Sequence, residues 1–369
     1  MSKKLIAAVV VAILFLLTTA TPILADGGFF PDSMYRDLYE SAQKAVILYG
    51  NCTGNCTGNC TGNCTEHLIL SVSWEGDAED FAWVVPVPSI PEIAVTNAEL
   101  FWELSDFTAT DIPDGNGGFA CTGGAAPTPG DGVDVIEEKV VGPYATAILS
   151  ATNATALADW LNANGYVFPE EGEEVVSEYI DKGWYFTATR INAVDEHTGY
   201  VLAEGAIAPI VLSFASNEVV YPLRISSLSA TEATPPEVLL YLLADCVMVP
   251  EQYPLYIGYG NWTENAFTLE FANNVSVEDL SEYYILPGLV STCLSGDEFY
   301  LTKLRGSISA DQMVDIEMVA YEDEDSLDLL ATTHTKRSDI VSLTMIVGPV
   351  IGLYFWRKHR RSVTSEESE

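Results

Sequence analysis

Both ends of the chain are apolar, and together they limit the part of the sequence that can form a water-soluble fold. Leu5–Leu17 is a short apolar run that follows Lys3 and Lys4, and small residues close this region at Ala25. A short apolar run behind positive charges and ahead of small residues is typical of a cleaved secretory signal. Residues 1–25 are therefore predicted to be a signal peptide, with an uncleaved N-terminal anchor as the alternative.

The second apolar run, Ile340–Trp356, contains no charged residue and is followed at once by cations at Arg357, Lys358, Arg360 and Arg361. An uncharged run of this length with a cationic end predicts a transmembrane helix whose C-terminal end stays in the cytoplasm. Residues 340–356 are thus predicted to be a single span and residues 357–369 a cytoplasmic tail. The expected topology is type I, with the N-terminal body outside the cytoplasm. The alternatives are a buried helix and a removable sorting tail.

The charge of the body excludes one class of partner. The sequence has 53 acidic and 16 basic residues, a formal net charge of −37. Lys3, Lys4 and the four tail cations lie outside the body, so the body is more acidic still. Such a surface repels phosphate backbones, and we expect no nucleic-acid partner. Cations, neutral glycans and basic surface proteins remain as candidate partners, and solubility is the plain explanation of the charge. Oligomeric state is left open.

Residues 51–65 form the most unusual local feature. The tetrapeptide Asn-Cys-Thr-Gly occurs three times in succession, and a fourth copy runs into Glu66. Each copy has the acceptor pattern for N-glycosylation, which also occurs further along the chain. The candidate glycosylation sites are Asn51, Asn55, Asn59, Asn63, Asn153, Asn261 and Asn274. Alternating apolar residues on both sides of the repeat predict two strands, so we expect the repeat at a hairpin tip.

The cysteines of the repeat are evenly spaced, and outside the cytoplasm such thiols form disulfides. A metal site is less favoured, because zinc ribbons use a two-residue gap within a cysteine pair. The chain has 7 cysteines, an odd number, so at least one is reduced or pairs with another molecule. Cys246 is expected to pack as a small core residue. The candidate disulfide residues are Cys52, Cys56, Cys60, Cys64, Cys121 and Cys293.

The body divides at residues 109–132, which are rich in glycine and proline and predict a long loop. This loop separates an N-terminal part of the ectodomain, residues 26–108, from its main part, residues 133–321. Residues 322–339 are acidic and polar and predict a stalk.

Short capped helices and period-two strands are interspersed through both parts. Thr96–Glu99 predicts a capping box that opens one helix, Thr152 or Asn153 caps a second, and a box at Ser276–Asp279 opens a third. Pro86 and Pro88 are expected to drive their strand to a sheet edge or out of the sheet. The predicted fold class is α+β: mainly antiparallel sheet with a few short helices, plus one C-terminal transmembrane helix.

Four strings of the body carry a resemblance: Asp26–Pro31, Gly76–Pro88, Gly183–Phe186 and Val220–Arg224. Taken together they resemble the prokaryotic family catalogued as domain of unknown function 2330, over roughly Asp26–Arg305. The resemblance implies an exported, surface-anchored protein without an established activity. It carries over no catalytic residue, and residues 51–65 look like an insertion relative to its pattern.

No constellation in the sequence specifies a reaction. His67, His197 and His334 are the histidines outside the predicted span and tail, and no pair of them has metal-ligand spacing. We therefore predict no catalytic, cofactor or metal residue.

The expected function is a structural or binding protein of the cell surface, of unknown biochemical activity. One alternative is an exported hydrolase that uses His197 with Asp195 and Glu196. Another is a subunit of a surface complex with an apolar patch around Trp83–Pro88.

Overall fold

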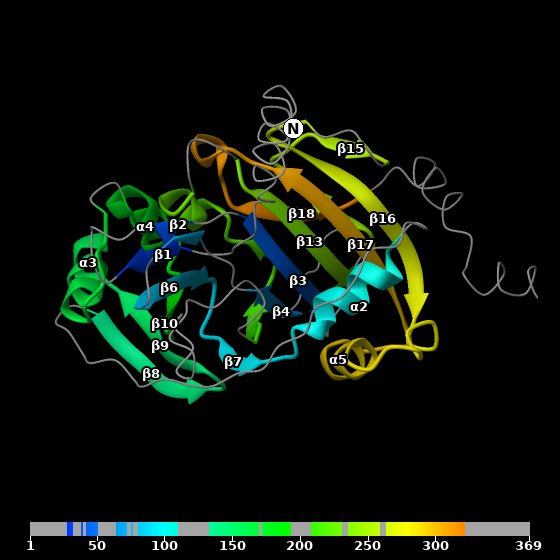
Figure 1. Cartoon of the computed structure of the whole chain (residues 1–369), viewed down its shortest axis with the longest axis horizontal. Coiled ribbons are helices and arrows are strands. Elements are labelled where there is room, and N and C mark those ends of the chain that lie inside the picture. The colour runs from blue at the N-terminus through cyan, green and yellow to red at the C-terminus, as the bar shows by residue number, and fades with distance from the viewer. Residues whose placement is uncertain are drawn as a thin grey trace, which may run out of the picture. The chain divides into compact units, whose positions relative to one another are not determined.

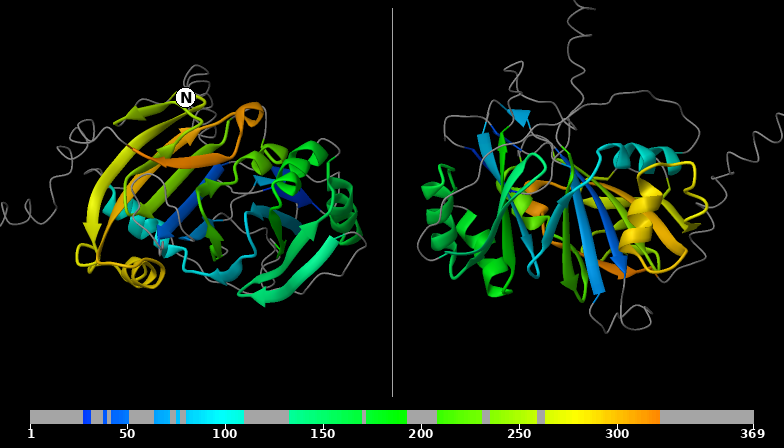
Figure 2. Two further views of the ribbon diagram at one scale, coloured as in Figure 1. Left: turned by 180° about the vertical axis from the view of Figure 1, so that it is seen from behind. Right: turned by 90° about the horizontal axis from the view of Figure 1, so that it is seen from below.

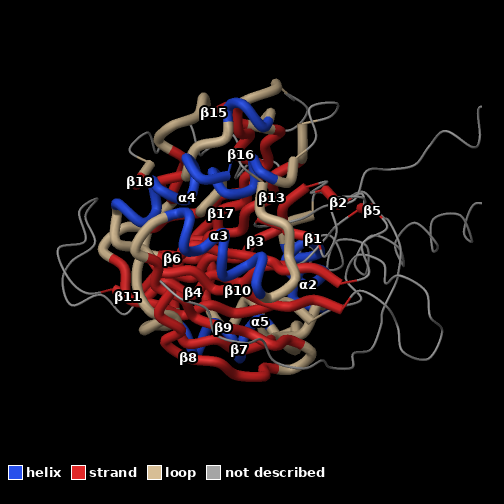
Figure 3. Tube along the Cα trace, turned by 90° about the vertical axis from the view of Figure 1, so that its left-hand side faces the viewer, coloured by secondary structure: helices blue, strands red, loops and turns tan. Residues whose placement is uncertain are grey.

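The described part of the chain is mainly β-sheet. The structure is a computed structural model that describes residues 28–31, 38–39, 42–50, 64–71, 75–76, 80–109, 133–169, 172–192, 208–230, 235–258 and 263–321. Figure 3 shows strands through the centre of this region, with short helices around them. The predicted α+β class with mainly antiparallel pairing is confirmed for these residues.

The largest sheet mixes parallel and antiparallel pairs. In spatial order its strands are β15 (Leu255–Ile257), β16 (Ala266–Ser276), β17 (Glu298–Ser307), β13 (Glu237–Ala244), β3 (Ala42–Gly50), β4 (Cys64–Ser71), β11 (Ile210–Ser216) and β7 (Glu92–Val95). β13 runs parallel to β3 and β15 runs parallel to β16, whereas the other neighbours are antiparallel. The centre of this sheet therefore joins an N-terminal hairpin to strands from the C-terminal half of the chain.

A second sheet of five strands is antiparallel throughout. Its order is β1 (Gly28–Pro31), β6 (Asp80–Val87), β10 (Tyr185–Asn192), β9 (Tyr144–Ala151) and β8 (Val133–Val141). Two smaller sheets consist of β12 (Val219–Tyr221), β18 (Ile316–Ala320) and β14 (Met248–Pro250), and of β2 (Leu38–Tyr39) and β5 (Glu75–Gly76).

Four α-helices lie within the described residues: α2 (Glu99–Phe107), α3 (Ala154–Ala163), α4 (Gly172–Asp181) and α5 (Leu286–Cys293), with short 3-10 turns η1 (Arg224–Leu228) and η2 (Ala310–Gln312). α3 begins as predicted, because the Asn153 side chain accepts a hydrogen bond from the Ala156 N–H at 2.9 Å. It ends before Gly165, whose φ of 90° lies in the left-handed region.

The helices cover the outer faces of the two large sheets. Apolar residues of α3 and α4, among them Trp160 and Tyr179, pack on one face of the five-stranded sheet. Apolar residues of α2 and α5 pack on one face of the eight-stranded sheet. The other face of each sheet is also buried, as Trp83 of β6 and Ile47 of β3 show. The right-hand view of Figure 2 shows the layers in the order helices, sheet, sheet, helices.

The edge position predicted for β6 is wrong, because β6 lies between β1 and β10. The strand does end at Val87, so Pro88 lies outside the sheet. The physical reason is local: β1 pairs only with residues 81–84 of β6, so Pro86 lies beyond the end of β1 and has no ladder bond to donate on that side. The same segment was expected to present an apolar patch. Instead, Trp83 is fully buried, so this part of the chain belongs to the interior.

The predicted helix at Ser276–Asp279 is also absent from the described residues. The box itself forms, since the Ser276 Oγ donates to Asp279 Oδ2 at 2.7 Å, but it closes only a turn. The helix α5 begins later, at Leu286. A distant carboxylate, described below, determines this start.

Several predicted segments lie outside the described residues: the signal peptide (1–25), most of the repeat, residues 110–132, the stalk (322–339), the span (340–356) and the tail (357–369). β3 and β4, which flank the repeat, do pair antiparallel, with Gly50 opposite Thr65. Within the described residues no helix has both the length and the apolar character needed to cross a membrane.

Candidate functional site

A cluster of buried charges lies on the face of the eight-stranded sheet that α2 and α5 cover. Its origin is a β-bulge in β16: Leu269 pairs with Leu304 and Phe271 with Lys303, which leaves Glu270 as the extra residue. In such a bulge two successive residues of one strand lie opposite a single residue of the partner and can share one face. Glu270 accordingly points to the same face as Lys303.

Glu270 holds two cations of β17. Its Oε1 lies 2.8 Å from Arg305 Nε and its Oε2 lies 3.2 Å from Lys303 Nζ. Arg305 also contacts Glu237 through Nη1. Glu270 is 3% and Lys303 6% exposed, so these charges depend on one another for compensation.

The surroundings of the cluster shift several pKa values. Burial lowers the pKa of Lys303, and the adjacent Glu270 carboxylate only partly opposes this. Burial alone would also lower the pKa of Arg305, but Glu237 and Glu270 outweigh it and raise that pKa. The Lys303 ammonium lies 5.8 Å from the centre of the Tyr241 ring. Burial raises the pKa of Tyr241 to about 12.

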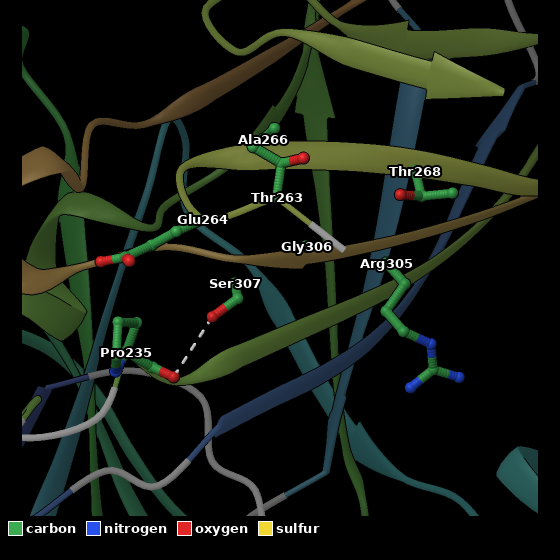
Figure 4. Close-up of a pocket in the computed structure, with 8 residues that line it drawn as sticks. All are labelled: Pro235, Thr263, Glu264, Ala266, Thr268, Arg305, Gly306 and Ser307. Carbon is green, nitrogen blue, oxygen red and sulfur yellow. Dashed lines mark hydrogen bonds between the residues drawn. The ribbon is translucent and has the colours of Figure 1, made fainter. Parts of the chain in front are cut away.

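A small pocket of about 190 Å³ opens beside this cluster, at the ends of β13, β16 and β17. It is lined by Pro235, Thr263, Glu264, Ala266, Thr268, Arg305, Gly306 and Ser307. In Figure 4 Thr268 and Arg305 lie at one end, with the guanidinium pointing away from Ser307 and Pro235. The Ser307 hydroxyl donates to the Pro235 carbonyl at 3.4 Å. Because Arg305 already binds Glu237 and Glu270, its guanidinium is committed to the protein.

A second polar pair joins two strands at the other end of the same sheet. His67 of β4 lies opposite Ser213 of β11, and its Nδ1 is 2.8 Å from the Ser213 Oγ. Glu92 of β7 lies opposite Ser213 on the other side. Burial lowers the pKa of His67, although the Cys293 carbonyl and Glu92 oppose the shift. Burial therefore favours the neutral imidazole, and the Ser213 hydroxyl donates to Nδ1 only in the tautomer that carries the ring proton on Nε2.

Sequence reasoning did not find this pair, because its two members are 146 residues apart and only the β4–β11 register brings them together. The residues next to His67 in the sequence gave no indication that its side chain meets a serine. The histidine that sequence reasoning did favour, His197, lies outside the described residues, as do Asp195, Glu196 and His334.

Two of the candidate glycosylation sites fall within the described residues. Asn153 is exposed at the start of α3, and Asn274 is exposed on β16. The side chain of Asn153 also serves as the N-cap, through its Oδ1. Asn51, Asn55, Asn59, Asn63 and Asn261 lie outside the described residues.

The cysteines differ in state. Cys64 at the start of β4 is disulfide-bonded, and its partner lies outside the described residues. Cys293, a candidate for a disulfide, is instead a buried thiol whose pKa burial raises to about 11. Cys246 was expected in the core, but it is only half-buried. Cys52, Cys56, Cys60 and Cys121 are outside the described residues, within which no group of three or more metal-ligand side chains is found.

Nearly all the described cations are paired. The lysines and arginines among these residues are Lys44, Lys139, Lys182, Arg190, Arg224, Lys303 and Arg305. Ion pairs with an aspartate or glutamate hold Lys139, Lys182, Arg190, Arg224, Lys303 and Arg305. For example, Lys182 Nζ lies 3.1 Å from Asp315 Oδ2. These positive charges are thus compensated by carboxylates of the protein itself, and the acidic residues in excess give the surface its negative charge.

A family model described as an uncharacterized protein conserved in bacteria, domain of unknown function 2330, matches residues 61–318. The chain belongs to this family. The matched range contains three of the four strings that suggested the resemblance, while Asp26–Pro31 precedes it. No curated protein and no solved structure matches the chain. Membership in the family brings no assigned site, so the geometry above has to carry any functional argument.

Proposed function

We propose that this protein is a single-span, membrane-anchored protein of the bacterial cell surface whose acidic body has a structural or binding role. The observation that carries the proposal is the distribution of charge. Six of the described lysines and arginines lie in ion pairs with carboxylates, and acidic residues outnumber basic ones 53 to 16 in the sequence, so the outer surface presents an excess of negative charge. Such a surface favours cations and basic proteins and disfavours nucleic acid and anionic headgroups.

The anchor rests on the two apolar ends of the sequence. Protease added to intact cells should destroy epitopes between Asp26 and Asp339 and spare epitopes within Ser362–Glu369. Permeabilised cells provide the control, since both sets should then be lost. Deletion of residues 340–356 should release the body from the membrane fraction. Protection of the body in intact cells would overturn the proposed location.

The binding role has a separate test. Full-length protein in neutral detergent should bind poly-lysine with an affinity that falls as salt is raised, and should not bind DNA of similar length. Binding of DNA under the same conditions would contradict the role assigned to the charge.

His67 and Ser213 favour a second candidate function, an exported hydrolase. A neutral imidazole hydrogen-bonded to a hydroxyl is the arrangement that activates a serine nucleophile. Ser213 lies within β11, which is paired to β4 on one side and β7 on the other, so its own backbone groups belong to the sheet. A fluorophosphonate probe should label full-length protein at Ser213, and labelling should disappear in His67→Gln, if this candidate holds. Absence of labelling in the wild-type protein would rule out the hydrolase.

A further inference from the structure

Two large aromatic side chains stand exposed on the outer layer formed by α2 and α5. Trp102 of α2 is 59% exposed, and Tyr284, just before α5, is 88% exposed. Figure 1 shows α2 and α5 next to each other on the outer side of the eight-stranded sheet. Aromatic rings in such positions contribute little to the core of the protein and are available to a partner.

Contacts of neighbouring residues join the two backbone segments that carry these rings. Glu103, which follows Trp102, accepts a hydrogen bond from the Tyr284 N–H at 2.9 Å. Tyr283, which precedes Tyr284, donates its hydroxyl to Asp106 Oδ2 at 2.9 Å. Hydrogen bonds therefore hold α2 and the segment before α5 together at the place where the two aromatic residues stand.

Carboxylates surround the rings. Glu99 and Asp106 lie one turn before and one turn after Trp102 on α2, and Glu282 precedes Tyr284 by two positions. Neither residues 99–107 nor residues 278–294 contain a lysine or an arginine. We name Trp102, Tyr284, Glu99, Asp106 and Glu282 the aromatic–acidic surface.

We propose that the aromatic–acidic surface docks an arginine-bearing segment of a basic partner protein. A guanidinium stacks on an aromatic face and pairs with carboxylates through its planar donors, so this combination of side chains matches arginine better than any other. The net charge of the body excludes an anionic membrane or nucleic acid as the occupant. This inference rests on the binding role proposed above, and it does not depend on the membrane anchor.

Binding of a fluorescent peptide of alternating arginine and glycine to full-length protein in neutral detergent tests the proposal. A peptide with lysine in place of arginine, and one with neutral citrulline, provide the chemical controls. Arginine should bind more tightly than lysine, and citrulline should not bind. Trp102→Ala should weaken arginine binding about fivefold to tenfold, which corresponds to one cation–π contact. Tyr284→Ala should have a smaller effect in the same direction.

Matched variants separate this surface from general attraction to an acidic protein. Tyr256 is a partly exposed aromatic residue on the edge strand β15, and Tyr256→Ala should leave binding unchanged. Glu99→Gln with Glu282→Gln should weaken binding more than Glu138→Gln with Glu173→Gln, which removes the same charge at distant positions. The aromatic residues are exposed, so these variants should keep the wild-type melting temperature.

Three results would overturn the proposal. One is equal binding of the arginine and lysine peptides. Another is a loss of binding in Tyr256→Ala as large as that in Trp102→Ala. A third is Trp102-dependent binding of a neutral oligosaccharide without any effect of Trp102→Ala on the arginine peptide, which would assign the surface to glycans. In each case poly-lysine binding by the wild-type protein would show whether the proposed function itself still stands.

Discussion

At the scale of single residues, buried carboxyl groups hold distant segments together. Glu66 of β4 is fully buried, and its Oε2 accepts from the Val220 N–H at 3.2 Å. Its Oε1 has no hydrogen-bond partner among the described residues. Burial raises the pKa of Glu66 well above its ordinary value, and the Val220 N–H only partly opposes this. The side chain is therefore best accommodated as a neutral carboxyl.

Glu66→Gln tests this assignment through pH. A raised folded-state pKa means that the stabilisation is complete below the unfolded value of about 4.5 and is lost as pH rises toward the folded value. The glutamine keeps an acceptor for Val220 and does not titrate. The free energy of unfolding of the wild type, relative to Glu66→Gln, should fall between pH 4.5 and pH 7 in urea titrations. A difference that stays constant over this range would contradict the assignment.

Glu103 fixes the start of α5 from another helix. Its two carboxylate oxygens accept from the N–H groups of Tyr284, Ile285 and Leu286 at 2.8 to 3.1 Å. An anion at this position satisfies the donors that open a helix and interacts favourably with its dipole.

Glu103→Ala should lower the free energy of unfolding by about 3 kcal/mol, because it leaves buried N–H groups without an acceptor. Glu99→Ala on the exposed side of the same helix is the matched control, with an expected change within about 0.5 kcal/mol. Chemical denaturation of both variants measures the difference. Equal effects would show that Glu103 does not hold α5.

At the scale of elements, local signals predicted some boundaries and missed others. α3 was predictable because its cap, its apolar face and its terminal Gly165 all lie within one short stretch. α5 was not, because the carboxylate that caps it belongs to α2. The bulge at Glu270 was likewise not predictable, since an extra residue in a strand can be recognised only when the pairing with the neighbouring strand is known. The pairs Glu270–Lys303 and His67–Ser213 depend on strand register, which no local pattern determines.

Trp160→Ala measures how firmly α3 is held. Trp160 is 2% exposed and packs in the core between α3, α4 and the five-stranded sheet. Its removal should cost about 3 to 5 kcal/mol of unfolding free energy. Trp102→Ala, the exposed tryptophan of α2, should cost less than about 0.5 kcal/mol under the same conditions. A small effect at Trp160 would mean that α3 is only loosely attached to the sheet.

At the scale of the whole molecule, the sequence predicted the class of the fold but not how its parts combine. Alternating strands and short capped helices correctly indicated α+β with mainly antiparallel pairing. The parallel pairing of β3 with β13 was not predictable, because the sequence of an apolar strand that is buried on both faces does not indicate which strand pairs with it. The residues that form the aromatic–acidic surface were visible in the sequence, yet only the packing of α2 against the segment before α5 brings them together.

The repeat offers a test of how much the fold depends on the connection between β3 and β4. Replacement of residues 51–64 by Asn-Gly joins the paired residues Gly50 and Thr65 with a native hairpin turn. The melting temperature of the full-length protein should fall by less than about 10 °C, since the free energy of closing a connection depends only weakly on its length. Cys64→Ser in the intact chain is the control for loss of the disulfide. A larger fall in the loop replacement than in Cys64→Ser would show that the repeat itself supports the fold.

The parallel register of β3 with β13 has a consequence for how the chain reaches its native state. Ala42 pairs with Glu237, so the hairpin of β3 and β4 is synthesised long before the strand that completes the centre of its sheet. Contacts between positions so far apart in sequence form slowly, and until then an apolar strand edge stays open to aggregation. A chaperone that covers the first hairpin until residue 244 has been synthesised would prevent this aggregation. The yield of folded protein in a cell should therefore depend on chaperones more strongly than the stability of the folded state suggests.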